Sequence, residues 1–279
     1  MAPTDVPVRP LNSGYDMPVI GLGTAPMDDA EAAAAVASAI EIGYRLVDTA
    51  TRYGNEVGVG RGLRASGVDR GDLFVTTKLR GSEQGRVSTQ TALEGSLERL
   101  GLDYIDLYLI HWPLPDLDRY LDSYETMLEL ANDGLIRSVG VSNFKPAHIE
   151  RLDRATRVLP AVNQIELSPA HARVDARDYH EANGIVTQAW SPLGVDEGVP
   201  LAPAVVEISE RYGVTPAQVI LRWEVQSGIT AVPKSSRPSR QATNLDVFSF
   251  TLAPADMATL SKLDLGEDTA VDSDRHVEY

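Results

Sequence analysis

The chain has 279 residues, of which 43% are hydrophobic, and its 25 Lys and Arg against 40 Asp and Glu give a net charge of −15. Nucleic acids and anionic membranes attract basic surfaces, so neither is an expected partner of so acidic a chain. The absence of cysteine excludes disulfides, thiolate metal ligands and a cysteine nucleophile.

The N-terminal segment 1–18 lacks the charged and apolar regions of a signal peptide. No stretch of the sequence approaches the roughly 18–20 apolar residues that a membrane helix needs. We therefore expect a cytoplasmic protein without a membrane span. Residues 10–23 follow with the pattern of a β-hairpin.

From there the chain alternates short apolar segments with longer amphipathic ones. The short segments are apolar on both faces, which is typical of parallel strands covered by helices. They lie at residues 45–50, 72–78, 105–111, 136–142, 161–166, 184–190, 228–234 and 245–250. Helices are expected between them, for example at 28–43, 88–101 and 122–134, and all three of these end in Gly, a common helix stop.

Eight strands with intervening helices predict a (β/α)8 TIM barrel, an α/β fold, with the N-terminal hairpin before it and a C-terminal loop after Leu265. The alternative is a doubly wound open sheet. Such a sheet usually has fewer strands and a Gly-x-Gly-x-x-Gly turn after the first, and GLGTAP (21–26) does not match that turn. No linker or composition break marks a second domain, so residues 1–279 are expected to form a single domain.

Ionisable residues end the first three predicted strands. These residues are Asp48, Lys78 and His111, and Tyr53 follows Asp48 by five positions. Each of them alone would more often be structural or solvated. Because the carboxyl ends of barrel strands share one face, where barrel enzymes build their active sites, we expect all four side chains to meet there.

The chemistry of this group is specific. A phenol has an unperturbed pKa of about 10, a nearby ammonium favours its ionised form, and a carboxylate can hold that ammonium in place. Tyr53 with Lys78 and Asp48 is therefore a predicted proton donor, and His111 a second hydrogen-bond donor for an oxygen atom. This set suits protonation of a carbonyl oxygen while hydride from a bound cofactor attacks the carbon, and no metal-binding motif accompanies it.

A basic segment, PKSSRPSRQATN (233–244), holds Lys234, Arg237 and Arg240 with no acid among them. It follows the seventh predicted strand, where barrels often bind phosphate, and Arg and Lys suit a phosphate monoester. The alternative is a solvated turn. Trp190 ends the sixth predicted strand and offers a flat face to a nicotinamide ring, unless it is simply part of the core.

Taken together and in order, these motifs make the sequence resemble the aldo-keto reductases, which are NADPH-dependent (β/α)8 barrels. It looks closest to the bacterial branch that includes the 2,5-diketo-gluconate reductases. The resemblance covers nearly the whole chain and is carried by VIGLGT (19–24), IGYRLVDTATRYGNE (42–56), VTTKL (75–79), GLDYIDLYLIHWP (101–113), VGVSNF (139–144), VNQIELSP (162–169), QAWSPLG (188–194) and VPKSSRPSRQATNLDVFSF (232–250).

The resemblance implies that Tyr53 is the general acid, supported by Asp48, Lys78 and His111, and that the cofactor is NADP(H). The residues implied at the nicotinamide end are Gly23, Thr24, Ser142, Asn143, Gln164 and Trp190. Those implied along the pyrophosphate, the 2′-phosphate and the adenine are Ser191 and Leu193, then Lys234, Ser235 and Arg240, then Asn244. The branch implies a monomer that reduces small carbonyl compounds.

Three positions depart from the family pattern. Ala25 stands where an aromatic residue is usual, and Arg80 follows TKL where Trp is common, so the substrate pocket beside Trp112 is expected to be wider and more cationic. Arg80 either favours acidic or polyhydroxylated substrates or points to solvent. Thr243 replaces a common Glu and weakens the expected adenine contacts.

Two other functions remain open from the sequence. One is a non-enzymatic, cofactor-binding regulatory or sensor protein on the same fold, against which the intact set of four ionisable residues argues. The other is an aldolase-like enzyme with Lys78 as a Schiff-base lysine, which leaves Tyr53 and the basic segment unexplained.

Overall fold

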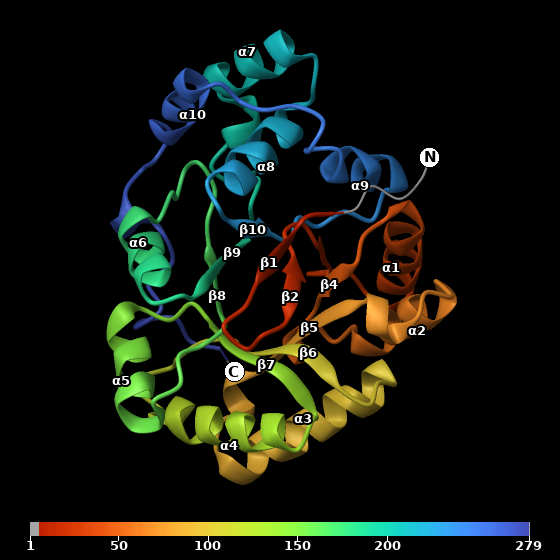
Figure 1. Cartoon of the computed structure of the whole chain (residues 1–279), viewed down its shortest axis with the longest axis vertical. Coiled ribbons are helices and arrows are strands. Elements are labelled where there is room, and N and C mark those ends of the chain that lie inside the picture. The colour runs from red at the N-terminus through yellow and green to blue at the C-terminus, as the bar shows by residue number, and fades with distance from the viewer. Residues whose placement is uncertain (1–5, 279) are drawn as a thin grey trace.

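A closed sheet of parallel strands forms the centre of the computed structural model, which describes residues 6–278. Neighbouring strands along the sheet are also consecutive in sequence (Figure 1). The strands are β3 (Leu22–Gly23), β4 (Leu46–Asp48), β5 (Phe74–Leu79), β6 (Ile105–Ile110), β7 (Ile136–Ser142), β8 (Val162–Glu166), β9 (Val186–Trp190) and β10 (Thr230–Ala231). Parallel bridges from Ile20 to Ala231 and from Gly23 to Lys234 join the first strand to the last. The predicted barrel is therefore confirmed.

Helices surround the sheet on its outside (Figure 1). They are α1 (Asp29–Ile42), α2 (Glu56–Ala65), α3 (Arg86–Leu100), α4 (Tyr120–Asn132), α5 (Pro146–Thr156), α6 (Val174–Ala182), α7 (Pro203–Tyr212), α8 (Pro216–Gln226), α9 (Pro238–Leu245) and α10 (Pro254–Ser261). Local sequence fixes their ends. The Asp28 side chain accepts a hydrogen bond from the Glu31 amide at the start of α1, and Gly43 ends that helix at φ 128°, which favours glycine. Among these helices, none is both long and apolar enough to cross a membrane.

One strand prediction was wrong, and the confirmed N-terminal hairpin has other bounds than predicted. Residues 245–250 form no strand: Leu245 ends α9, and side chains of α8 hold the following loop through the carbonyls of Asp246 and Val247. Leu245 and Val247 are buried by this packing instead of by strand pairing, and Phe248 and Phe250 pack partly buried against the core. At the other end of the chain, the hairpin is limited to β1 (Val8–Pro10) and β2 (Asp16–Pro18).

The first barrel strand is instead β3, which the sequence analysis placed inside the hairpin. A strand of two residues is too short to show an apolar pattern. Asp48, Lys78 and His111 consequently belong to the second, third and fourth barrel strands. Trp190 ends the seventh strand, and the basic segment follows the eighth.

The barrel interior is a packed apolar layer, which the hairpin closes at the amino ends of the strands with Leu11 and Met17. Strand side chains alternate between this layer and the helices, with a period of two residues. Leu46, Phe74 and Leu109 point inward. Asp48 follows Leu46 by two residues, Lys78 follows Phe74 by four, and His111 follows Leu109 by two. The same alternation therefore points these three side chains into the barrel at its carboxyl end.

Candidate active site

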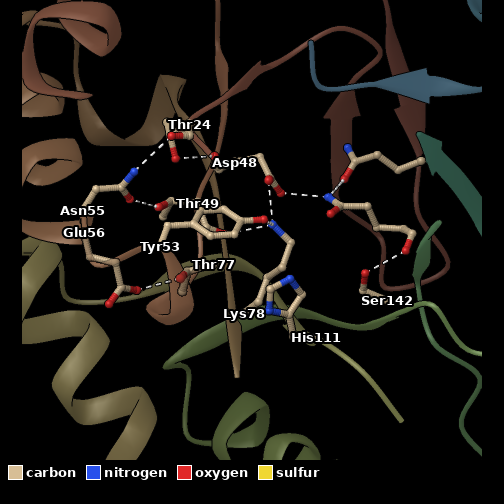
Figure 2. A network of polar contacts seen from close by, with 12 residues as sticks. Thr24, Asp48, Thr49, Tyr53, Asn55, Glu56, Thr77, Lys78, His111 and Ser142 are labelled. Carbon is tan, nitrogen blue, oxygen red and sulfur yellow. Dashed lines mark hydrogen bonds and ion pairs between the residues drawn. The ribbon is translucent and has the colours of Figure 1, made fainter. Parts of the chain in front are cut away.

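The four predicted ionisable residues meet at the carboxyl end of the barrel. Lys78 Nζ lies 2.6 Å from Asp48 Oδ1 and 3.4 Å from Tyr53 Oη (Figure 2). The rings of Tyr53 and His111 pack edge to face with centroids 5.8 Å apart. The strands β4 and β5 and the segment after β6 supply three of these groups. Tyr53 comes from η1 (Thr51–Tyr53), a single turn between β4 and α2.

Buried polar residues that the sequence analysis missed hold this turn in place. The Asn55 side chain is fully buried and donates to the carbonyls of Thr24 and Met27 at 3.0 and 2.9 Å, and its oxygen accepts from the Thr49 hydroxyl at 2.7 Å. Glu56 accepts from the Thr77 hydroxyl at 2.6 Å (Figure 2). The sequence signal for these two residues was their position directly after Gly54. A Gly followed by two polar residues is also the pattern of an ordinary surface turn, so it did not mark them as buried.

Burial decides which protonation state Tyr53 adopts. Removal from water raises the pKa of Tyr53 above that of a free phenol, although the Lys78 ammonium opposes the shift. The Lys78 ammonium alone, which is all that the sequence shows, would favour the phenolate. The phenol instead keeps its proton at neutral pH, which is the form that a proton donor requires.

Lys78 is a fixed cation. Burial acts to lower the pKa of Lys78, but Asp48 and Tyr53 outweigh burial and raise it. The ammonium is fully buried and also donates to the Thr49 carbonyl at 3.0 Å. A Schiff-base lysine needs an accessible neutral amine, so this geometry argues against the aldolase-like alternative.

A chain of hydrogen bonds joins this group to the predicted amide-binding residues. Gln164 Nε2 donates to Asp48 Oδ2 at 2.8 Å and to Gln188 Oε1 at 2.6 Å. Ser142 Oγ donates to the Gln164 carbonyl at 2.7 Å, and Asn143 Nδ2 donates to the His111 carbonyl at 3.0 Å. Gln188, which positions Gln164, was not singled out in the sequence because its strand is otherwise apolar.

A cavity of about 240 Å³ opens above these residues. The predicted site residues that line it are Gly23, Thr24, Ala25, Asp48, Tyr53, His111, Trp112, Asn143, Gln164, Trp190, Ser191 and Lys234. Those outside its lining are Lys78, Arg80, Ser142, Leu193, Ser235, Arg240 and Asn244. Hollows of about 350 and 410 Å³ lie elsewhere, against the N-terminal hairpin and away from the ionisable group, so size alone does not identify the site.

The basic segment begins at the edge of this cavity. Lys234 lines it, half-exposed, with Nζ 3.7 Å from Glu31 Oε1 at the start of α1. Ser235 is buried and accepts from the Arg237 amide at 3.2 Å. Arg240 is exposed in the first turn of α9, and Asn244 is buried near its end. The cavity that Tyr53 lines thus reaches Lys234, near the start of the basic segment.

The C-terminal loop was predicted, but its position over the site was not. His276 stacks on Trp112 with ring centroids 3.6 Å apart, and Glu278 Oε1 lies 2.7 Å from His111 Nδ1. Arg80, beside this loop, is the N-terminal cap of η3 (Gly81–Glu83), so its role toward substrates remains a prediction.

Comparison with known proteins decides the family. Residues 19–265 match the model of the Aldo/keto reductase family. The chain belongs to this family. An aldo-keto reductase from Mycolicibacterium vanbaalenii is 50% identical over 262 residues, which cover 94% of this chain and 93% of that protein.

Solved structures of similar proteins have the same fold. A crystal structure of an aldo/keto reductase from Brucella melitensis superposes with a TM-score of 0.90 at 44% identity, over 93% of this chain and all of that one. A variant of Gox0644, crystallised in complex with NADPH, superposes with a TM-score of 0.92 at 42% identity, over 97% of this chain and 98% of that one. The family prediction is therefore confirmed.

Proposed function

We propose that this aldo/keto reductase uses NADP(H) to reduce aldehydes and ketones to alcohols, with Tyr53 as the general acid. The observation that supports this most is the buried phenol, which faces the cavity with its proton retained and with Lys78 Nζ 3.4 Å from its oxygen. The NADPH bound to a solved relative supports the choice of cofactor.

The residues around the cavity fit NADP(H), a dinucleotide that carries a 2′-phosphate. The amide side chains of Asn143 and Gln164 line the cavity. The Gln164 amide nitrogen already donates to Asp48 and Gln188, so its oxygen, Oε1, is the atom that can accept a hydrogen bond from the cofactor. Trp190 stands beside them as a stacking surface. Ser191 and Leu193 follow Trp190 along the path of the pyrophosphate, and Gly23 and Thr24 border the opposite wall. Lys234, Ser235 and Arg240 supply charge and a hydroxyl for the 2′-phosphate, and Asn244 lies behind them for the adenine.

NADPH, when bound, supplies the hydride that reduces the carbonyl carbon. Tyr53 gives its Oη proton to the carbonyl oxygen, so one hydride and one proton convert the carbonyl into an alcohol. Lys78, itself held by Asp48, stabilises the phenolate that remains. His111 donates a hydrogen bond to the same oxygen. All of these groups come from one chain, so we propose a single catalytic domain that is complete as a monomer.

The proposed substrates are small carbonyl compounds. Ala25 and Trp112 both line the cavity, so a small methyl side chain and an indole contribute to its wall. Motif resemblance to the 2,5-diketo-gluconate reductases supports α-dicarbonyls and keto-sugars as substrates. A panel of these compounds and simple aldehydes should consume NADPH, followed by its absorbance, much faster than NADH.

Tyr53→Phe tests the catalytic role. It should bind NADPH like the unaltered protein but lose about 10²–10⁴-fold in kcat, the usual contribution of a general acid. Tyr15→Phe, at a partly exposed phenol on the hairpin, is the matched control. Turnover retained by Tyr53→Phe would rule out this role, and NADPH binding without turnover of any compound would favour the regulatory alternative.

A further inference from the structure

The C-terminal segment 271–278 lies across the mouth of the barrel. The Val271 amide donates to Glu166 Oε2 at 2.7 Å, and Lys145 Nζ pairs with Asp272 at 2.6 Å. The segment thus bridges the ends of β8 and β7. These contacts bring the last described residue, Glu278, next to the site.

Glu278 is buried there, with 5% of its surface exposed. Its Oε2 accepts from the Gly81 amide at 2.9 Å, and its Oε1 lies 2.7 Å from His111 Nδ1. In the described part of the chain, neither Oε1 nor Nδ1 has any hydrogen-bond partner, so their contact is a short ion-pair distance and not an aligned hydrogen bond. Two lone pairs repel each other at 2.7 Å, so one of these two atoms must carry a proton.

That proton belongs on the ring. The contact with His111 and the Gly81 amide outweigh burial and hold the pKa of Glu278 below its usual value, so its carboxyl group is ionised at neutral pH. With Nδ1 protonated and paired with Glu278, the nitrogen left for a ligand is Nε2. Nε2 can donate a hydrogen bond only if the ring is an imidazolium, and a buried cation needs a counter-ion.

Glu278 is the acid placed to be that counter-ion. Asp48 is already engaged by Lys78 and Gln164. Among the described residues, the other charged or titratable groups near the pair include Arg52 and Tyr53 of η1, His276 of the same segment and Arg80 beside Gly81, and none of these four is a carboxylate. Figure 2 shows His111 beside Lys78 and Tyr53, on the side of the network away from Asn55.

We propose that Glu278 is a positioning residue for His111: its carboxylate keeps a proton on Nδ1 and fixes the ring so that Nε2 donates to the substrate oxygen. Closure of the C-terminal segment thereby completes the active site. This proposal rests on the proposed carbonyl reduction for the role of Nε2, but the pairing itself does not depend on turnover.

Glu278→Gln tests the proposal because it retains the shape of the side chain and removes its charge. Asp268→Asn, an exposed acid in the same C-terminal loop, is the matched control. The first readout is the nitrogen spectrum of the five histidines in protein labelled at the imidazole ring, with His111→Asn identifying the signal of His111. The unaltered protein should carry a proton on Nδ1, and Glu278→Gln should move the ring toward the form protonated on Nε2 alone.

The second readout is kinetic. Loss of a charge-assisted hydrogen bond should lower kcat by about 10–100-fold in Glu278→Gln and leave the dissociation constant of NADPH unchanged. Gly81→Ala is an independent variant, because a Cβ there would come within 2.7 Å of the Glu278 carbonyl oxygen and also press on Leu114. It should displace the segment and lower kcat in the same way.

Two results would overturn the proposal. One is an Nδ1 without a proton in the unaltered protein, and the other is a Glu278→Gln protein that matches Asp268→Asn in both spectrum and kcat. If the unaltered protein reduces no carbonyl compound, the proposed function fails, and the spectrum alone then confirms or refutes the pairing of Glu278 with His111.

Discussion

The indole of Trp190 donates from Nε1 to Oδ1 of Asn143 at 2.8 Å. Trp190 ends β9 and Asn143 directly follows β7, so the bond passes over the end of β8, which lies between these two strands. It fixes the plane of the indole against the cavity wall. Asn143 has φ 63°, a left-handed conformation that Asn tolerates better than most residues. The sequence analysis placed both residues at the nicotinamide end but did not predict their contact, which makes them one surface.

Trp190→Phe should weaken cofactor binding, because the smaller ring has no donor to hold it against Asn143. A lost neutral hydrogen bond costs about 0.5–1.5 kcal/mol, which corresponds to a rise of roughly two- to tenfold in the dissociation constant. NADPH and NADH share the nicotinamide, so both should weaken equally in calorimetric titrations. A change confined to NADPH would contradict this placement.

Arg240→Ala and Lys234→Ala should affect NADPH alone. Each removes a cation proposed to bind the 2′-phosphate, and the dissociation constant of NADPH should rise about 10–100-fold. Glu31→Gln should have the opposite effect, because Glu31 lies 3.7 Å from Lys234 Nζ and competes with the phosphate. Arg154→Ala, on the exposed side of α5, is the control. Equal losses for NADH would show that these residues act elsewhere.

Asp48→Asn should destabilise the fold as well as stop turnover. It leaves the fully buried Lys78 ammonium without its anion, and breaking a buried pair costs about 3–5 kcal/mol of unfolding free energy. The double variant Asp48→Asn/Lys78→Met removes both charges and should recover part of that stability in urea titrations, while remaining inactive.

Glu150→Gln is the control for this comparison. It breaks the exposed pair with Arg154, at 3.6 Å, and should change the unfolding free energy by less than about 1 kcal/mol. If Asp48→Asn is as stable as Glu150→Gln, the buried pair is not the structural link that its distances indicate.

His180 should make stability depend on pH. It is fully buried between Asn163 and Thr187, and burial lowers its pKa from 6.5 to about 4. Between about pH 4 and pH 6.5, His180 therefore binds a proton more readily in the unfolded chain than in the folded one. The unfolding free energy consequently rises with pH over this range. The unfolding free energy should fall by about 2 kcal/mol between pH 7 and pH 5 on account of this group.

His180→Gln removes the titrating ring and isolates its contribution. Urea unfolding of both proteins at the two pH values gives the comparison, in which carboxylates that titrate elsewhere cancel. The variant should lose about 2 kcal/mol less than the unaltered protein on acidification. Equal losses in both proteins would show that His180 is not held neutral in the folded state.

Sequence alone determined the barrel and the inward position of the catalytic candidates. Leu46 and Asp48 differ by two residues, as do Leu109 and His111, and that period places each pair on the same face of its strand. Parallel strands then bring together side chains that are about 30 residues apart in sequence. The order of the motifs along the chain predicted the family. Local pattern was sufficient because strand direction and side-chain alternation are local properties.

Tertiary structure alone decided the rest. It closed the barrel through β3, which is too short to recognise, and packed the apolar side chains of 245–250 against the core without making these residues a strand. It raised the pKa of Tyr53, since burial depends on the whole surrounding fold. It also brought Glu278 to Gly81, 197 residues away in sequence. Contacts over such distances follow no periodic pattern, because they depend on where the packed barrel leaves room for the chain to return.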